Sequence, residues 1–349
     1  MEISLGTQII LGVIVLNLLL WPLLSKWAEN HLEIFLLLVG VGAVTVTRGW
    51  SKEFIYQTLN APVNVAFIVL VVSVIFNYYS RYIFRVLFML FRYFQPRHSF
   101  AILVLLVGLT SSIFGVTVAA LVLAEVLQVV NLERSQTIKI TVYACYAIGL
   151  GAVLLPLAEP LGLIIHNELA AGPHQADFFF MLRHFGWWIV PGVALMAFGA
   201  GYTVRDANTQ VQLHIREDKE SYKSMLRRTW HIYMFVAALH LISTGLRPFA
   251  QSTIAHLSGK ILFWGNAASV VIDNATLAAI EITPAVTLHN LMYMVIGLAA
   301  FGSMLVQGNL PNIVAAEKLG IKSREWARVA VPAGLVLMTG YFAALCVGL

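Results

Sequence analysis

The chain has 349 residues, of which 59% are hydrophobic and only 11% are charged, and its formal net charge is +5. Soluble globular domains carry about 25% charged residues, so this composition excludes an ordinary soluble protein. Its basic residues lie in the segments between apolar runs, which argues against a nucleic-acid partner. Runs of about 20 apolar residues match the thickness of a bilayer. We therefore expect an all-α polytopic membrane protein with the lipid bilayer as its surroundings.

The apolar runs predict eight membrane crossings. Residues 1–60 hold the first two, and the first is expected to be a retained helix, because no basic residue precedes it and no small-residue cleavage site follows. Two other apolar stretches, 99–130 and 262–285, are interrupted by LTSSIFG and IDNAT. Each is predicted to be a re-entrant hairpin that enters and leaves on one side. The predicted crossings are 5–24, 31–46, 61–79, 140–170, 184–202, 229–246, 286–317 and 328–348.

The basic residues predict the orientation of the chain. The polar loop 203–228 is rich in Lys and Arg, which places it in the cytoplasm. With this loop inside and both hairpins re-entrant, both termini lie outside a prokaryotic plasma (inner) membrane. The segment 81–94 spaces arginines among aromatic residues and predicts an amphipathic helix on the cytoplasmic surface. All but five of the 22 basic residues then fall inside, the exceptions being Arg48, Lys52, Arg183, Arg247 and Lys260.

Two parts of the chain, 61–202 and 229–349, repeat one order of features. Each has a crossing, a surface stretch, a hairpin, an interrupted crossing and a closing crossing. Their hairpins enter from opposite sides, so the order predicts an inverted-topology repeat, in which a binding site forms near the midplane between broken helices. The paired features are the hairpins 99–130 and 262–285 and the broken helices 140–170 and 286–317.

The interruptions in the two broken helices are rich in proline and glycine. The first is GLGAVLLPLAEPLG, where Pro156 and Pro160 flank Glu159, and the second is GSMLVQGNLPN at 302–312. Proline removes a backbone donor, and glycine lowers the stability of a helix, so backbone polar groups are freed at mid-depth. Such groups are tolerated in a membrane only inside protein or beside a wet cavity. The two matched breaks therefore predict a substrate site.

These motifs resemble those of the ion transporter superfamily, which includes NhaD-like antiporters and ArsB-like pumps. The GNLPN sequence at 308–312 resembles a GNPPN-type signature, and IDNATLAA resembles a pattern of NhaD-type sodium/proton antiporters. LTSSIFG and LLPLAEPLG resemble the corresponding first-half elements. Across roughly 60–349 the chain most resembles a small prokaryotic branch designated DUF1646, and the resemblance implies a homodimer. Departures at 151–156 and at Thr110-Ser111-Ser112 argue against dicarboxylate transport.

Asp273 is the foremost candidate for the ion site. Its carboxylate, with Asn309 as a second oxygen donor, is suited to Na⁺, and it could also bind a proton, so competition between the two ions would couple their exchange. The alternative is a cap for the helix that follows. Glu159 is its predicted counterpart in the first half. The full set of candidate ion-binding or substrate-binding residues is Ser111, Ser112, Glu159, Asp273, Asn274, Thr276, Asn309 and Asn312.

Two further carboxylates, Glu125 and Glu281, lie on the exit arms of the predicted hairpins. Each is a candidate proton relay or, equally, a solvated side chain near the interface. The chain contains no nucleotide-binding glycine loop, no HExxH motif and no nucleophile elbow. We therefore expect no enzymatic activity and no cofactor, with Na⁺ or H⁺ as the coupling ion and an ion gradient as the energy source.

The leading prediction is a secondary transporter of a small inorganic cation, most simply a sodium/proton antiporter that works by alternating access. The alternative is sodium-coupled uptake or efflux of a small anion, such as a carboxylate, an oxyanion or a metalloid, held at helix N-termini. An anion site would be expected to include an unpaired basic residue at mid-depth. The distribution of Lys and Arg instead places each of them near an interface, which favours a cation.

Overall fold

The computed structural model describes residues 4–130, 132–156, 160–170, 174–204, 221–253, 257–270, 274–282 and 286–347, and within these ranges the chain forms helices and no strand. The helices of the first half are α1 (Leu5–Leu24), α2 (Lys26–Asn30), α3 (Leu32–Val46), α4 (Lys52–Tyr93), α5 (Pro96–Phe114), α6 (Val116–Val129), α7 (Arg134–Ala152), α8 (Pro160–Ala170) and α9 (Phe180–Thr203). Those of the second half are α10 (Tyr222–Thr253), α11 (Gly259–Gly265), the 3₁₀ helix η1 (Asn266–Val270), α12 (Asn274–Glu281), α13 (Leu288–Phe301), the 3₁₀ helix η2 (Val306–Gly308), α14 (Leu310–Leu319) and α15 (Ser323–Val347).

Several helices have the length and composition needed to cross a bilayer. Their outward faces carry large apolar side chains such as Trp187 on α9 and Val336 on α15, which are 83% and 72% exposed. An apolar exterior of this kind is costly in water and favourable in lipid. Among the described residues, five segments are long and apolar enough to cross a bilayer: Leu5–Pro22, Pro96–Phe114, Phe180–Thr203, Met225–Phe249 and Ser323–Val347. Together they fit a transmembrane protein.

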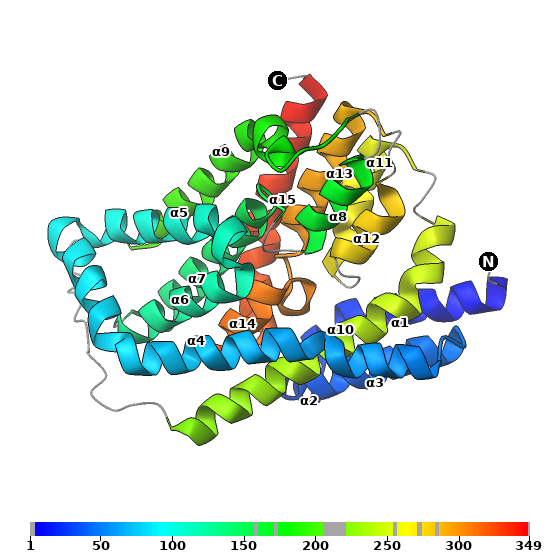
Figure 1. The fold of residues 1–349 in the computed structure, drawn as a ribbon, viewed down its shortest axis with the longest axis horizontal. Helices are drawn as coiled ribbons and strands as arrows, with labels where there is room; N and C mark the ends of the chain where they lie inside the picture. Colours follow the sequence, from blue (N-terminus) through cyan, green and yellow to red (C-terminus); the bar gives the residue numbers. More distant parts are fainter. Residues whose placement is uncertain are drawn as a thin grey trace.

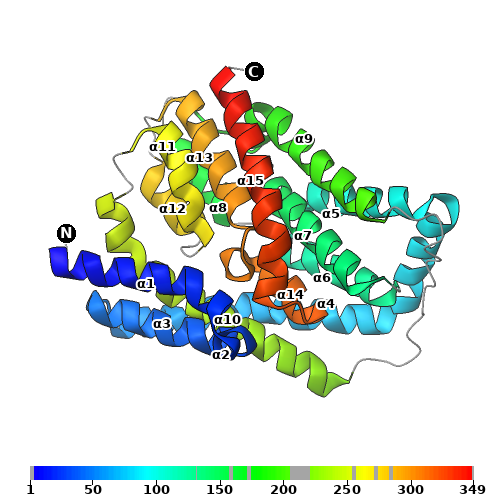
Figure 2. The same ribbon diagram turned by 180° about the vertical axis from the view of Figure 1, so that it is seen from behind.

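The helices form two groups in space. Helices α1, α3, α4 and α10 run along one side of the molecule, and α10 packs against both α3 and α4 (Figures 1 and 2). The remaining helices, apart from α2, which packs against α1 and α3, form a bundle beside this group. The hairpin segments and the interrupted helices all belong to the bundle, while α10 contacts it through α12 and α14. The first group is therefore placed to support the bundle, whose interior holds the candidate site.

The two halves of the bundle share one set of contacts. Helix α5 packs against α7 and α7 against α9, just as α11 packs against α13 and α13 against α15. The second arm of each hairpin segment crosses to the other half, since α6 packs against α14 and α12 packs against α8. The two halves therefore contact each other through the second arms of their hairpin segments.

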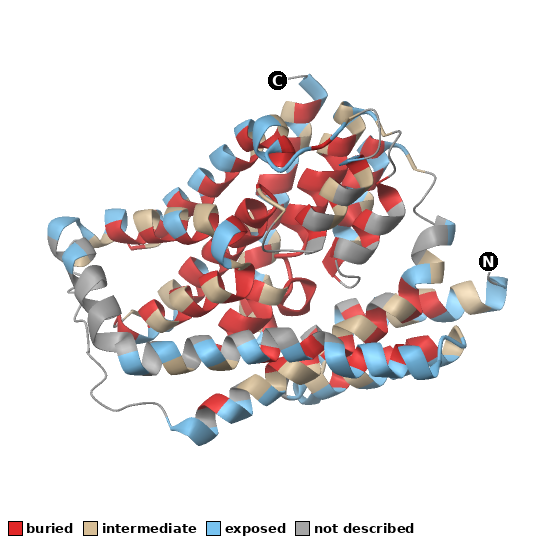
Figure 3. Cartoon of the chain, viewed as in Figure 1, coloured by how far each residue is buried: buried red, intermediate tan, exposed pale blue. Residues whose placement is uncertain are grey.

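The most deeply buried elements are the helices that precede the two interruptions. From Ile140 to Ala152 in α7, and from Tyr293 to Phe301 in α13, nearly every residue is buried (Figure 3). A helix that is apolar on all sides has no solvent-facing stripe and is stable only when other helices surround it. Polar groups at the ends of these helices therefore lie in the interior of the protein.

Some predicted boundaries differ from the observed ones. The predicted crossing 61–79 and the predicted surface helix 81–94 belong to one continuous helix, α4, because no proline or glycine separates them. The first arm of the second hairpin is short, since α11 ends at Gly265 and continues as η1. Helix α10 begins at Tyr222, within the predicted loop 203–228, while most of that loop lies outside the described residues.

Candidate functional site at the crossing of two interrupted helices

Both interrupted helices end at the positions where the sequence places breaks. Helix α7 ends at Ala152 and is followed by turns over 153–156, the described part of the first break. Helix α13 ends at Phe301, and residues 302–309, the second break, lead through η2 to the start of α14 at Leu310. Backbone polar groups at these ends lack the continuous helical ladder, so they are available to side chains or to a ligand.

The end of α7 lies directly against the second break. A Cβ atom placed on Gly149 would come within 3.2 Å of Asn309 Nδ2 and 3.3 Å of Ser303 Oγ. One turn earlier, the Cys145 carbonyl accepts a hydrogen bond of 3.3 Å from Ser303 Oγ. The glycine lets two backbones that are far apart in sequence approach closely. The interrupted helices of the two halves therefore meet in the interior.

Two predicted site residues organise the second break. Asn312 Nδ2 donates to the carbonyls of Gly302 at 3.0 Å and Leu305 at 2.8 Å, both of which follow the end of α13. Asn309 caps α14, because its Oδ1 accepts a hydrogen bond from Leu310 N at 2.8 Å. Both roles are structural, and each leaves one amide atom, Asn312 Oδ1 and Asn309 Nδ2, without a partner.

The second hairpin segment, which comprises α11, η1 and α12, touches the same break from another side. A Cβ atom on Gly302 would lie 3.1 Å from Asn274 Nδ2, and one on Gly308 would lie 3.2 Å from the Cα atom of Val270. Val270 and Asn274 flank the residues 271–273. The predicted ion-binding residue Asp273 lies outside the described residues, as do Glu159 and the side chain of Thr276.

The first hairpin segment, α5 and α6, contacts the end of α7 in a different way. The chain turns at Gly115, whose φ of 93° lies in a region that other residues rarely adopt. Ser111 Oγ donates to backbone carbonyls, to Gly108 O at 2.6 Å and to Ile148 O of α7 at 3.0 Å, while Ser112 Oγ lies 3.3 Å from Leu109 O. The two serine hydroxyls thus donate hydrogen bonds to helix carbonyls. The second hairpin segment, by contrast, contains buried polar atoms without a hydrogen-bond partner.

The two predicted relay carboxylates have different surroundings. Glu125 on α6 forms an ion pair with Lys318 on α14, and the Lys318 side chain is fully buried. Glu281 at the end of α12 is 5% exposed, and neither of its oxygens has a hydrogen-bond partner among the described residues. The alternative prediction, a solvated side chain near the interface, is therefore wrong for Glu281. Glu125 is also largely shielded from solvent.

Three buried polar residues of this region did not stand out in the sequence. Asn266 and Ser269 lie in η1 and are 0% and 1% exposed, and Gln307 in η2 is 4% exposed. All three occur inside apolar stretches, where one amide or hydroxyl changes the mean hydropathy little. The sequence did contain a signal for Asn266 and Ser269. Polar side chains within an apolar hairpin arm are costly in a membrane, so their presence there indicates a functional role.

Buried polar atoms without a partner are concentrated on the second hairpin segment and the second break. Buried side-chain polar atoms in proteins are normally hydrogen-bonded, so each exception calls for an explanation. Besides the carboxyl oxygens of Glu281, the atoms in this region are Asn266 Oδ1, Ser269 Oγ, Asn274 Oδ1, Gln307 Oε1, Asn309 Nδ2 and Asn312 Oδ1. Oxygen atoms predominate among them.

The orientation of several of these amides follows from their partners. The amide nitrogens of Asn266, Gln307 and Asn312 each donate to a backbone carbonyl, so the atom left free in each is the oxygen. Such oxygens are ligands preferred by hard cations. Among the described residues no group of three or more His, Cys, Asp or Glu side chains could hold a metal ion, so a cation here would be bound mainly by neutral oxygens and by groups outside that part of the chain.

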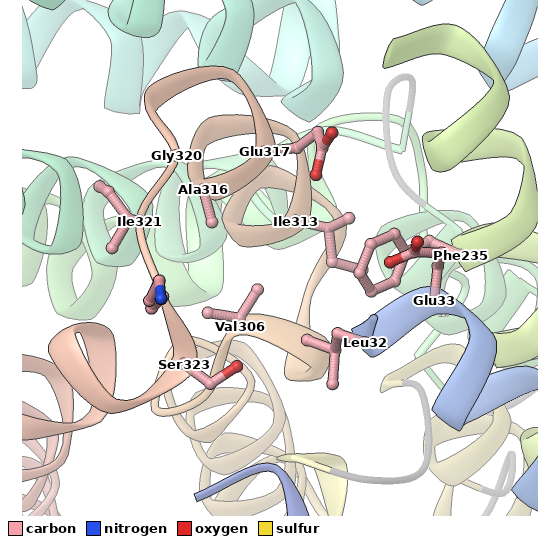
Figure 4. A pocket seen from close by; sticks show the side chains of 11 residues that line it. Leu32, Glu33, Phe235, Val306, Ile313, Ala316, Glu317, Gly320, Ile321 and Ser323 are labelled. Carbon is pink, nitrogen blue, oxygen red and sulfur yellow. The ribbon is translucent and has the colours of Figure 1, made fainter. Parts of the chain in front are cut away.

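A separate cavity of about 200 Å³ opens beside α14 (Figure 4). One face of α14 contributes Ile313, Ala316 and Glu317, and Glu33 of α3 contributes a second carboxylate. Glu317 also forms a 2.8 Å ion pair with His231 of α10. The lining of the cavity runs from Gly320 and Lys322, which follow α14, to Val306 in the second break.

Comparison with known proteins gives one result that covers the chain. A family model described as a protein of unknown function, DUF1646, matches residues 8–347. A comparison with curated proteins gives no match. Because the family model spans nearly all of the 349 residues, the chain belongs to the DUF1646 family of proteins of unknown function.

Proposed function

We propose that this protein is a secondary active transporter of a small inorganic cation, and that it exchanges sodium for protons by alternating access. The observation that carries the proposal is the set of buried, unpartnered oxygens on the second hairpin segment and the second break. Five of the six amide and hydroxyl atoms without a partner there are oxygens, and oxygens favour a hard cation over an anion.

The arrangement of the helices supports transport rather than a static ion site. Two interrupted helices meet at Gly149 and Asn309, and the hairpin segments pack against them. In the proposal, α4–α9 and α10–α15 are inverted repeats, their hairpin segments are re-entrant, and their relative movement exposes the site to each side in turn. The cavity beside α14 is one route by which ions would reach the site.

Within this proposal Asp273 provides the charge that binds the ion. Its chain neighbours Val270 and Asn274 lie against Gly308 and Gly302 of the second break. Sodium and a proton would compete for the Asp273 carboxylate, and this competition couples their movements. Thr276 and Asn312 are proposed to assist through oxygen atoms, and Glu159 to act from the first half.

The alternative is a transporter of a small anion. Asn309 Nδ2 is a donor without a partner, and it lies at the N-terminus of α14, where the helix dipole favours negative charge. The buried basic residue Lys318 does not add to this case, because its charge is neutralised by Glu125. We therefore prefer the cation.

The test is a transport measurement in reconstituted vesicles. With an inward sodium gradient, the wild-type protein should move protons outward, and Asp273→Asn should abolish that movement. Asp177→Asn is the matched control, since Asp177 is an exposed residue that pairs with Arg183 on the surface. If the wild-type protein moves no protons with Na⁺, Li⁺ or K⁺ but accumulates an oxyanion, the anion alternative replaces the proposal.

A further inference from the structure

We propose that Gln307 is a ligand of the transported cation, and that helix α1 positions it through a backbone carbonyl that Pro22 leaves without a helical partner. The role of Gln307 rests on the proposed function and adds to it, because α1 lies outside the two proposed repeats. Gln307 is not among the ion-binding residues expected from the sequence, so it would be a further residue of the same site.

Gln307 lies in η2, within the second break, and is 4% exposed. Its amide nitrogen, Nε2, donates a hydrogen bond of 3.3 Å to Leu18 O of α1. Its amide oxygen, Oε1, is buried and has no hydrogen-bond partner among the described residues. Because a carbonyl can only accept, its contact with the amide nitrogen fixes the orientation of the Gln307 amide. The free atom of Gln307 is therefore an oxygen, the kind of ligand that a hard cation prefers.

The carbonyl of Leu18 is available to Gln307 because of Pro22. In an α-helix each carbonyl accepts from the N–H group four residues later, and proline has no N–H group. Pro22 lies inside α1, four positions after Leu18. Leu18 is 1% exposed, so its carbonyl needs a partner within the protein. Gln307 Nε2 supplies the donor that Pro22 lacks.

A second hydrogen bond fixes the same end of α1 to the bundle. Leu24 is the last residue of α1, and its carbonyl belongs to the group at a helix end that has no helical partner. Arg324 Nη2 of α15 donates to this carbonyl at 2.9 Å. The end of α1 is therefore held in place against the bundle, and it offers Gln307 an acceptor at a fixed position.

A fixed orientation favours ion binding because a glutamine side chain has several rotatable bonds. Ordering one flexible side chain at the moment of binding lowers affinity by roughly twofold to tenfold. The hydrogen bond to Leu18 O orders Gln307 before the ion arrives. The oxygen is then held within the second break, beside Gly308 and Asn309, where η2 packs against η1 and α14.

Gln307 would act together with Asp273 and not in its place. Gly308, the residue after Gln307, approaches the second hairpin segment, since a Cβ atom on it would lie 3.2 Å from the Cα atom of Val270. Val270 precedes Asp273 by three residues. In the proposal Asp273 provides the charge and Gln307 a neutral oxygen, so sodium and the proton still compete for the Asp273 carboxylate.

Transport of ²²Na⁺ in vesicles tests the ligand. Gln307→Met keeps the length of the side chain and removes both amide atoms. It should raise the half-saturation concentration for sodium by about tenfold or more, as expected when a polar contact with a charged group is lost. An unchanged half-saturation concentration in folded Gln307→Met would overturn the assignment of Gln307 as a ligand.

Pro22→Ala tests the role of α1. It gives Leu18 O a helical donor, so Gln307 keeps its oxygen and loses its fixed orientation. The half-saturation concentration for sodium should rise roughly twofold to tenfold with little change in the maximal rate. The unfolding temperature should stay equal or rise, because alanine favours a helix interior over proline. A purely structural role would instead lower stability and affinity together.

Two further variants complete the experiment. Pro22→Ala should add nothing in the Gln307→Met background, because both changes act on one amide. Pro62→Ala makes the same substitution inside α4 and should leave sodium affinity unchanged. A Pro22→Ala effect that persists in full without Gln307 would overturn the role of α1. If Gln307→Met fails to fold, Pro22→Ala alone decides, and an unchanged half-saturation concentration overturns the proposal.

Failure of this proposal and failure of the proposed function give different results. If the wild-type protein neither moves sodium nor is stabilised by it against thermal unfolding, the proposed function fails. If the wild-type protein responds to sodium and both Gln307→Met and Pro22→Ala respond equally, the cation site stands and only the role of Gln307 and α1 is lost.

Discussion

The side chain of Asn312 on α14 holds the carbonyl of Gly302 at the end of α13, with 3.0 Å between Nδ2 and the oxygen. The same nitrogen also donates to Leu305 O. One side chain therefore connects the two parts of an interrupted helix and satisfies carbonyls that the interruption leaves without helical partners. The remaining oxygen of Asn312 is free to face a ligand.

Asn312→Ala should destabilise the protein, because two buried carbonyls lose their donor. Leaving a buried acceptor unsatisfied costs about 1–3 kcal/mol, and the temperature of unfolding in detergent should fall accordingly. Asn60→Ala is the control, since Asn60 is an exposed residue that donates to Tyr56 O within its own helix. An unfolding temperature equal to that of the control would show that Asn312 does not support the break.

Gly308→Ala should disrupt the second break. The added Cβ would come within 2.4 Å of Gly302 O and 3.2 Å of the Cα atom of Val270, and neither backbone atom can move freely. Overpacking of this kind costs about 1–3 kcal/mol, and transport should be lost together with stability. Gly340→Ala adds the same methyl group at a position with no atom within 4 Å. Equal thermal stability and transport in the two variants would contradict the close approach.

Lys318 and Glu125 should behave as a coupled pair. Removal of one partner from a buried ion pair costs about 3–5 kcal/mol, whereas replacement of both by apolar residues is often tolerated. Lys318→Met should therefore lower the unfolding temperature strongly, and Lys318→Met combined with Glu125→Leu should recover much of the loss. Additive effects in this double-mutant cycle would mean that the two residues do not interact. The cycle also separates Glu125 from Glu281, whose oxygens have no hydrogen-bond partner among the described residues.

The sequence was informative where a local pattern determines the structure. Proline and glycine at 149–162 and 302–312 placed the helix breaks, and the interruption LTSSIFG, predicted in the first hairpin, ends at the turn between α5 and α6. It was uninformative where contacts join distant residues. Glu125 and Glu281 have equivalent positions in their hairpin segments, and they differ because Lys318, which is 193 residues from Glu125, pairs with only one of them.

The roles of individual polar residues were harder to predict than the breaks. Hydropathy is averaged over a window of residues, so Asn266 and Ser269 hardly lower the mean hydropathy of the apolar stretch ILFWGNAASVV. Whether an amide bonds to the backbone or faces a ligand depends on helix packing, as Asn309 illustrates, because its oxygen caps α14 while its nitrogen faces Gly149. The length of α4 was also missed, since a run of arginines and aromatics suggested a boundary that the backbone does not require.

The cavity beside α14 yields a prediction about ion entry. Glu33 and Glu317 both line it (Figure 4), and carboxylates around an opening raise the local concentration of cations. Glu33→Gln combined with Glu317→Gln should raise the half-saturation concentration for sodium several-fold, with little change in the maximal rate. The loss of the Glu317–His231 pair should affect stability little, because both side chains are partly exposed, at 29% and 24%.

A control variant separates this local effect from the overall charge of the protein. Glu53→Gln removes one of the two units of charge that the double variant loses, at an exposed position on α4, where Glu53 accepts a hydrogen bond from Gln57. The double variant should also lose its difference from wild type at high ionic strength, because salt screens charges that are open to solvent. If sodium affinity falls by half as much or more in Glu53→Gln as in the double variant, the cavity is not the route of entry and the effect belongs to net charge alone.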